Sequence, residues 1–219
     1  MGREIELKIP LSEEQYKNLF DFVTGVKKID GEDIEISGLD RIKKSDEYYT
    51  RYGSLVERNE KGEKQVIRIR SLSKGTIGEV LPELDKGKIK PLPVTQSFFC
   101  LKCKTIENGI ELNREDETFV ENADVIRDIL LLSGYHKYFE KKKDVLSVFC
   151  RRGALSKIVF HVELEIVNGL KYLEVEVTDE GVAADEVRTE LENFIEVLGL
   201  DVANKDSRNW MEILNGDVL

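Results

Sequence analysis

Cysteine, histidine and proline are scarce in this sequence. Its 219 residues include three cysteines, two histidines and four prolines. An odd and small number of cysteines gives no disulfide framework. Cys100 and Cys103 have CxxC spacing, but no second pair follows, and residues three apart in an extended segment point to opposite faces. We interpret them as reduced core or wall residues rather than a metal pair, and two histidines are too few to predict a histidine-based zinc site.

A basic excess and long apolar runs are also absent. Acidic residues number 43 against 33 basic residues, a formal net charge of -10, which argues against a nonspecific nucleic-acid binder with a basic surface. Anionic substrates are not excluded, because bound divalent cations can reverse the local sign of the charge. No apolar signal core opens the chain, and no stretch approaches the length of a membrane span. We therefore expect a cytoplasmic protein without a membrane or nucleic-acid partner, and the sequence leaves its oligomeric state open, a homodimer included.

Helical patterns occur in three segments. Ser12 and Gln15 are spaced as a capping box before an apolar stripe, and Asn122 is the candidate N-cap of the second segment. The predicted helices run from about residue 12 to 27, from 122 to 133 and from 182 to 198. The polar residues 28–45 predict a loop beside a weak strand. Residues 72–97, which contain three of the four prolines, predict a long loop or a small insertion.

Strand patterns dominate the rest of the chain. Residues 4–8 read EIELK, an alternation that places Glu4, Glu6 and Lys8 on one face of a strand. Similar alternation predicts strands at about 46–53, 64–71, 98–106, 110–120, 137–149, 158–167 and 171–178. Asn-Gly turns at 108–109 and 168–169 are typical of hairpins. The sequence therefore predicts one α+β domain over residues 1–219, with eight strands and three helices.

One face of nearly every predicted strand is charged, and the charges come in like-signed sets. The sets are Glu4 with Glu6, Arg68 with Arg70, Lys102 with Lys104, Lys141 with Lys143, Glu163 with Glu165, and Glu174 with Glu176. Any one set alone is typical of exposed surface, and we expect Glu140 and Lys142 to be such surface residues. The joint pattern is different, since like charges side by side on a sheet are unfavourable. If the apolar faces pack outward against the helices, the charged faces converge inside a closed eight-stranded antiparallel β-barrel, where bases hold a polyphosphate and acids hold Mg²⁺ or Mn²⁺.

This ordered set of charged residues resembles a known family. EIELK is similar to the ExExK signature of the CYTH superfamily, or triphosphate tunnel metalloenzymes, which includes class IV adenylyl cyclases, thiamine triphosphatases and inorganic tripolyphosphatases. Further matches follow in order along nearly the whole chain: Asp46 and Tyr48, Arg68 and Arg70, Lys102, Arg114 with Asp116, Lys141 and Lys143, Glu165, and Glu174 with Glu176. The resemblance implies a β-tunnel that binds a small-molecule triphosphate, such as tripolyphosphate or ATP, inside it.

The resemblance also implies a role for each matching residue. Glu4, Glu6, Glu165, Glu174 and Glu176 would bind Mg²⁺ or Mn²⁺, and Lys8, Arg68, Arg70, Lys102, Arg114, Lys141 and Lys143 would hold phosphate oxygens. Glu4, Glu6 and Lys8 would also act in catalysis. Two registers compete around residues 110–117: an outward Ile110 puts Glu115 and Glu117 inside, whereas the family pattern puts Arg114 and Asp116 inside, which needs a β-bulge.

Hydrolysis of a bound triphosphate, inorganic or organic, is the leading prediction for the activity. It needs only a grip on the phosphates and a metal that helps to activate water. The alternative is a class IV-type adenylyl cyclase that converts ATP to cyclic AMP and pyrophosphate, a branch that the segment around Asn209 and Trp210 resembles. A third hypothesis is a non-catalytic polyphosphate- or nucleotide-binding module, against which the intact acids argue. An RNA 5′-triphosphatase is disfavoured by the lack of a basic surface.

Overall fold

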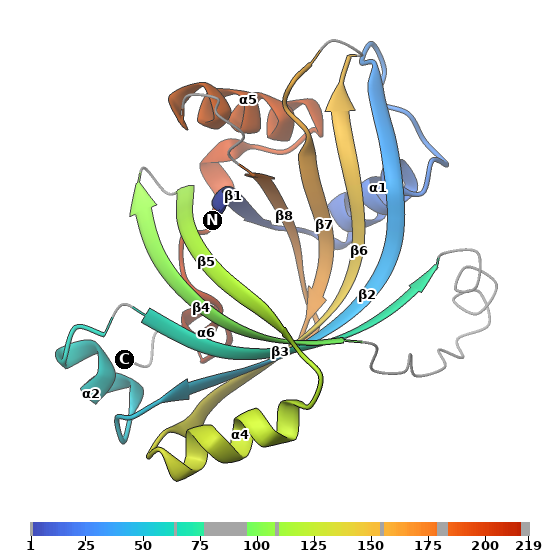
Figure 1. Cartoon of the computed structure of the whole chain (residues 1–219). Coiled ribbons are helices and arrows are strands. Elements are labelled where there is room, and N and C mark those ends of the chain that lie inside the picture. The colour runs from blue at the N-terminus through green and yellow to red at the C-terminus, as the bar shows by residue number, and fades with distance from the viewer. Residues whose placement is uncertain are drawn as a thin grey trace.

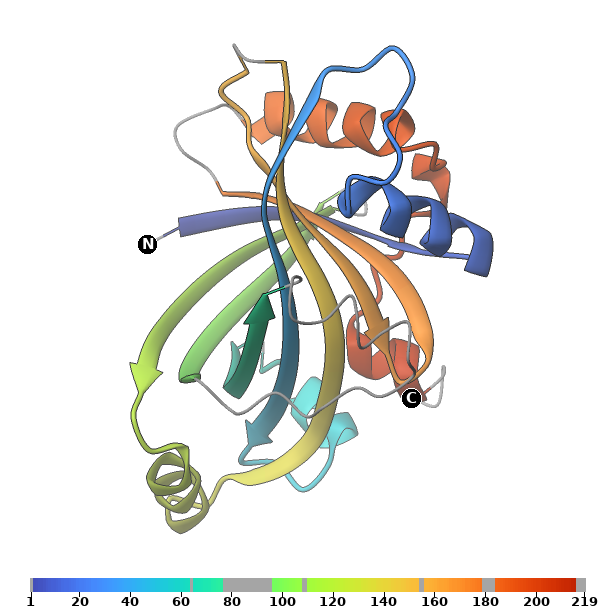
Figure 2. The same ribbon diagram turned by 90° about the vertical axis from the view of Figure 1, so that its right-hand side faces the viewer.

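Eight strands pair in one continuous antiparallel sheet in the computed structural model, which describes residues 2–63, 65–76, 96–107, 110–153, 156–178 and 184–215. The strands are β1 (Gly2–Pro10), β2 (Ile34–Thr50), β3 (Gln65–Thr76), β4 (Gln96–Glu107), β5 (Ile110–Val120), β6 (His136–Arg152), β7 (Phe160–Val167) and β8 (Leu170–Thr178). Their spatial order is β1-β5-β4-β3-β2-β6-β7-β8, and β1 pairs with both β5 and β8, so the ring of strands is closed. Figure 1 and Figure 2 show the long strands strongly curved, as closure requires.

Helices flank the ring of strands at both ends of the molecule. They are α1 (Glu13–Val23), α2 (Leu55–Glu60), α4 (Ala123–Leu132), α5 (Ala184–Val197) and α6 (Trp210–Asn215), with a short 3₁₀ helix η1 (Val202–Asn204). In Figure 1 and Figure 2, α1 and α5 lie at one end of the molecule and α4 at the other. The α1 helix contacts β7 and β8, α5 contacts β1 and β8, and α4 contacts β4. Within the described part of the chain, no helix has both the length and the apolar character needed to cross a lipid bilayer.

The apolar face of the strands packs against α1 and α5. Ile5 and Leu7 of β1 are at most 1% exposed and share one core cluster with Leu19 of α1 and Leu191 of α5. Successive side chains of a strand point to opposite faces. The charged residues that alternate with this apolar set therefore face the interior of the ring.

The predicted antiparallel sheet of eight strands with flanking helices is confirmed. Ser12 and Gln15 form the predicted capping box of α1, although that helix ends at Val23, earlier than predicted. Asn122 caps α4 by accepting from the backbone N–H groups of its first turn. The short helices α2, η1 and α6 are not among the predicted ones, because each is too brief to show a helical period.

Both predicted hairpins are present. The β4–β5 pair continues to the Glu107–Ile110 pair, and the β7–β8 pair continues to the Val167–Leu170 pair. Asn168 and Gly169 of the second turn have φ angles of 50° and 85°, as a type I′ turn requires. The predicted insertion over 72–97 is shorter than expected, since β3 extends to Thr76 and β4 begins at Gln96; its remaining residues, 77–95, lie outside the described ones.

The prediction of a loop beside a weak strand over residues 28–45 is correct in containing a strand and wrong in the extent of the loop. The β2 strand begins at Ile34 and pairs with both β3 and β6. The sequence hides this strand because charged residues occupy both of its faces. On the outer face Arg41 is only 4% exposed and donates to both carboxylate oxygens of Asp144, at 2.9 and 2.5 Å. Partners on neighbouring strands, which local pattern cannot show, stabilise these charges.

Candidate functional site

The inner face of the ring of strands lines a cavity of about 360 Å³. Most of the predicted site residues line it, namely Glu6, Lys8, Arg68, Arg70, Lys102, Lys141, Lys143, Glu174 and Glu176. They come from β1, β3, β4, β6 and β8, and the alternation of side chains along each strand brings them to the same face. Glu165 of β7 lies beside them, fully buried, with Oε1 2.5 Å from the Nζ of Lys143. Residues far apart in the sequence therefore meet in one cavity.

Arg114, a predicted phosphate ligand, lies on the outer face instead. No bulge interrupts β5, which pairs with β4 in continuous register. The Arg114 side chain is 57% exposed, and its Nη2 lies 3.0 Å from Asp116. Ile110 is buried in the outer core, so the register that it sets places Glu115 and Glu117 in the cavity. The prediction that Arg114 points inward is wrong. The opposite register would move Ile110 out of the core, and burial of such an apolar side chain stabilises the fold.

Three carboxylates form a compact oxygen cluster on β7 and β8. Glu163, Glu165 and Glu174 each offer one oxygen, and these oxygens all lie within 4.8 Å of one another. The Oε2 atom of Glu165 is buried and has no hydrogen-bond partner among the described residues, a need that a bound cation would satisfy. Hard oxygen donors of this kind suit Mg²⁺ or Mn²⁺. We call these three residues the acid cluster, and its donor set fits a divalent metal ion.

Two further predicted metal ligands, Glu6 and Glu176, are cross-strand partners on β1 and β8 and line the same cavity. Since β8 also carries Glu174, these acids adjoin the acid cluster. The backbone of Glu4 pairs with Thr178 of β8, but the Glu4 side chain lies outside the described part of the structure.

Burial and lysine side chains set the charge of the acid cluster. Lys143 Nζ donates to Glu165 at 2.5 Å and to Glu174 at 2.7 Å, and Lys44 Nζ donates to both oxygens of Glu163 at 2.5 and 2.6 Å. Burial raises the pKa of Glu165, and the nearby Glu174 charge raises it further. Burial also opposes charge on Glu174, but Lys143 holds the pKa of that carboxyl well below its usual range. Of Glu165 and Glu174, Glu165 is therefore the one that holds a proton more readily.

Asp46 of β2 organises the basic wall of the cavity. Its fully buried carboxylate accepts from Nε and Nη2 of Arg70 at 2.8 and 3.0 Å and lies 3.4 Å from Nζ of Lys141. Burial alone would raise the pKa of Asp46, but the charges of Arg70, Arg68 and Lys141 hold it well below its usual range. Burial and the charge of Lys143 lower the pKa of Lys141. Several cations surround one carboxylate here, which favours the binding of a further anion.

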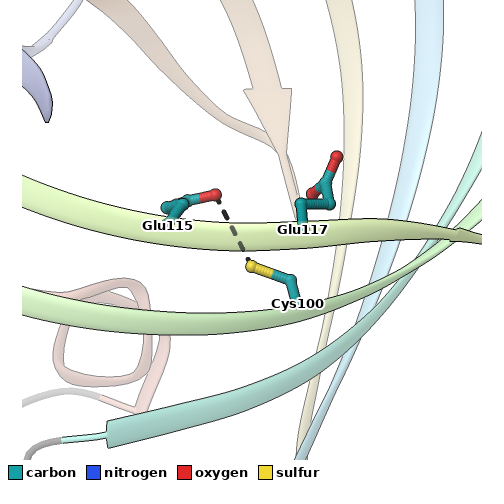
Figure 3. Close-up of side chains that lie close together, drawn as sticks. All are labelled: Cys100, Glu115 and Glu117. Carbon is teal, nitrogen blue, oxygen red and sulfur yellow. Dashed lines mark hydrogen bonds between the residues drawn. The ribbon is translucent and has the colours of Figure 1, made fainter. Parts of the chain in front are cut away.

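Cys100, Glu115 and Glu117 form a second group of candidate metal-ligand atoms within 4.8 Å of one another. Figure 3 shows the two glutamates on β5 and the cysteine on the neighbouring β4. Arg68 Nη2 lies 3.1 Å from Glu115, 3.4 Å from Glu117 and 3.4 Å from the Cys100 sulfur. Burial raises the pKa of the Cys100 thiol to about 12, so it stays protonated at neutral pH. We interpret this group as the anchor of Arg68, whose guanidinium, together with Lys102 at 2.7 Å from Glu115, balances the charge of the two acids.

Trp210, the single tryptophan, covers part of the cavity from the start of α6. The Nζ atoms of Lys8, Lys141 and Lys143 lie 5.4, 5.4 and 5.0 Å from the centre of its ring. Asn209 fixes this turn, because its Oδ1 accepts from the backbone N–H groups of Met211 and Glu212 at 3.0 and 3.1 Å. The C-terminal segment therefore presents an aromatic ring to three lysines of the basic wall.

Several cavity residues are missing from the predicted site: Lys44, Glu115, Glu117, His161 and Glu163. The predicted loop concealed Lys44, and the register ambiguity concealed the two glutamates of β5. His161 Nδ1 lies 2.6 Å from Glu176, and its Nε2 lies 2.7 Å from the hydroxyl of Ser147. Strand alternation could have found His161 and Glu163, because both share the face of Glu165.

No family model and no curated protein matches the sequence. Similar solved structures include a candidate adenylate cyclase from Vibrio parahaemolyticus, 18% identical over 97% of this chain and 98% of that chain, with a TM-score of 0.62. The chain has the fold of this structure and of the two that follow. A protein from Pyrococcus horikoshii is 15% identical over 98% and 99% of the chains, with a TM-score of 0.62. HpAC1 from Hippeastrum, a candidate adenylyl cyclase described as revealing a dominant triphosphatase activity, is 12% identical over 100% and 97%, with a TM-score of 0.57. The chain thus shares its fold with candidate adenylate cyclases, as the predicted resemblance implies.

Proposed function

We propose that this protein is a divalent-metal-dependent triphosphatase that binds an inorganic or organic triphosphate inside its β-tunnel. The main support is one observation: a basic wall and an acid cluster face the same cavity. Basic side chains match the charge of phosphate oxygens, and the carboxylates match the needs of Mg²⁺ or Mn²⁺. HpAC1, which shares the fold, is described as having a dominant triphosphatase activity.

The size of the cavity supports a compact ligand. Its volume of about 360 Å³ lies at the lower end of the range of roughly 300–1,000 Å³ for small-molecule sites. A triphosphate chain suits such a space, and any organic group attached to it would extend toward the opening. Arg68, Arg70 and Lys102 would hold the phosphate oxygens from β3 and β4, and Lys8 and Lys141 would hold them from β1 and β6.

The chain's own residues contribute position and charge to the reaction. The metal would be held by carboxylates of the cavity, namely Glu6, Glu163, Glu165, Glu174 and Glu176. When bound, it would supply charge neutralisation and activation of water. Arginines and lysines fixed by buried acids are already oriented before the substrate arrives, so little reorganisation is needed as negative charge shifts during phosphoryl transfer. Asp46 provides this orientation for Arg70, and Glu115 provides it for Arg68.

Adenylyl cyclase activity is the second candidate. Candidate cyclases of Vibrio parahaemolyticus and Bacillus halodurans share the fold, and Tyr48, Phe139 and Trp210 give the cavity aromatic rings on which an adenine could stack. Cyclisation requires the nucleotide base inside the cavity in a bent pose, a larger demand on space than triphosphate hydrolysis makes. A non-catalytic triphosphate-binding module is the third candidate.

Product analysis separates these candidates. The purified protein is incubated with Mg²⁺ or Mn²⁺ and either inorganic triphosphate or ATP, beside the variant Glu6→Gln. We expect orthophosphate from triphosphate with the wild type, and none with the variant or with excess EDTA. Cyclic AMP with pyrophosphate from ATP would instead establish the cyclase. Tight binding of triphosphate without any product would establish the binding module.

The outward position of Arg114 gives a further prediction. Arg114→Ala should change the KM for triphosphate by no more than about twofold, because its exposed side chain lies on the outer face and does not line the cavity. Arg68→Ala should raise the KM about tenfold or more, since a hydrogen bond to a charged group contributes roughly 1.5–3 kcal/mol. Steady-state kinetics on both variants, with melting curves to confirm folding, checks this. Equal losses in the two variants would mean that Arg114 reaches the substrate.

A further inference from the structure

Lys143 contacts the acid cluster, although it faces a cavity whose basic residues suit phosphate. Its Nζ donates to Glu165 at 2.5 Å and to Glu174 at 2.7 Å, and the side chains of Lys143 and Glu165 are 4% and 0% exposed. Lys141, two residues earlier on the same face of β6, is equally buried but pairs with Asp46 at 3.4 Å. Of these two lysines, only Lys143 shares the carboxylates that a metal ion would use.

An ammonium group and a divalent ion cannot both be satisfied by these carboxylates. Mg²⁺ binds carboxylate oxygen at about 2.0–2.1 Å, and the oxygens of the acid cluster all lie within 4.8 Å of one another. A cation placed among them would sit within a few ångströms of the Lys143 Nζ, where repulsion in a buried site is strong. Lys44 contacts one member of the acid cluster, Glu163, whereas Lys143 contacts the other two.

We propose that Lys143 is an exchangeable internal cation. In this inference, which rests on the proposed function, a divalent metal displaces the Lys143 ammonium from Glu165 and Glu174, and the released ammonium binds a phosphate oxygen of the substrate. The lysine side chain can make this change because a flexible four-carbon stem carries its charge. Its Nζ already lies 5.0 Å from the Trp210 ring, on the cavity side of the strand.

This exchange couples the two ligands of the site. Metal binding frees a cation for the triphosphate, and triphosphate binding removes a competitor of the metal. Each ligand therefore raises the affinity for the other by the same factor, typically about 5- to 150-fold for such coupling. The coupling selects the metal–triphosphate complex over either ligand alone.

Calorimetric titration of Mn²⁺ into the full-length wild type, Lys143→Gln and Lys141→Gln tests the exchange. Removal of any nearby positive charge strengthens metal binding somewhat, and Lys141→Gln measures that general effect from the same face of the same strand. We expect Lys143→Gln to bind Mn²⁺ about tenfold more tightly than Lys141→Gln does, within the usual range of coupling. Lys143→Arg keeps the charge and should stay near the wild type, and melting curves on every variant confirm that it folds.

The second half of the exchange is measured with a non-hydrolysable methylene analogue of triphosphate. Saturating Mg²⁺ should raise the affinity of the wild type and of Lys141→Gln for this analogue, and should raise that of Lys143→Gln much less. Equal Mn²⁺ affinities in the two glutamine variants, or weaker binding by Lys143→Gln, would overturn the exchange and leave the proposed triphosphatase intact. Absence of Mn²⁺ binding by the wild type itself would overturn both the exchange and the metal dependence of the proposed function.

Discussion

Replacing Glu174 by glutamine is expected to reduce the metal-dependent release of orthophosphate by roughly a hundred- to a thousandfold, the effect of removing one electrostatic stabiliser of a transition state. Glutamine has nearly the same shape but no charge. The acid cluster would lose one of its three carboxyl groups, the one that Lys143 contacts at 2.7 Å. Loss of the Glu174 carboxylate weakens metal binding, so the defect should persist at saturating substrate.

Glu140→Gln is the matched control for this measurement. Glu140 lies on β6, its side chain is 33% exposed, and it pairs with Lys137 and Lys142 at the surface. We expect its variant to keep wild-type kcat and KM. Initial rates over a range of Mn²⁺ concentrations would show whether Glu174→Gln can be rescued by more metal. A Glu174→Gln enzyme with more than a tenth of the wild-type rate would mean that the metal binds elsewhere in the cavity.

Local pattern was sufficient to predict which strand faces are charged. The side-chain period of a strand is two, so EIELK alone places Glu6 and Lys8 on the face opposite Ile5. The helix starts at Ser12 and Asn122 could be predicted for a similar reason, because a capping side chain bonds residues two or three positions away. Interactions of this kind lie within a few residues of sequence.

The failed predictions depend on pairing between distant strands. Whether β5 contains a bulge is decided by its register with β4 and β1, and that register places Glu115 rather than Arg114 in the cavity. Apolar alternation in β2 stops after Ile36, and Asp144 on β6 and Glu163 on β7 neutralise the Arg41 and Lys44 that follow. A single sequence does not show such partners, and for this reason it does not predict Lys44 as a site residue.

The acid cluster shows the same division. Strand alternation predicts that Glu163 and Glu165 share a face, and likewise Glu174 and Glu176. It does not predict that Lys143 of β6 lies between two of these acids, because that position depends on the register of β6 with β7 and on the length of the lysine side chain. The inference of cation exchange is therefore available only from the structure.

Asp46→Asn is expected to lower the free energy of unfolding by about 3–5 kcal/mol, the range for removing one partner of a buried ion pair. Asp46 is 0% exposed and accepts two hydrogen bonds from Arg70. The variant leaves the charges of Arg70 and Lys141 in the interior with no carboxylate between them. Asp116→Asn is the control, since its pair with Arg114 has side chains 41% and 57% exposed and such surface pairs contribute about 0–1 kcal/mol. Urea denaturation at neutral pH measures both.

The effect of Asp46→Asn should also depend on pH with a definite sign. Folding holds the pKa of Asp46 well below its usual range, because the nearby charges of Arg70, Arg68 and Lys141 outweigh burial. In the unfolded chain the pKa of Asp46 has its ordinary value of about 3.9. A depressed pKa stabilises the folded state above that value, and the contribution is lost as the pH falls through the folded pKa. The difference between wild type and variant should therefore be constant from neutral pH to about pH 5 and shrink below about pH 4. A difference that stays constant into this acid range would mean that lost packing, rather than lost charge, destabilises the variant.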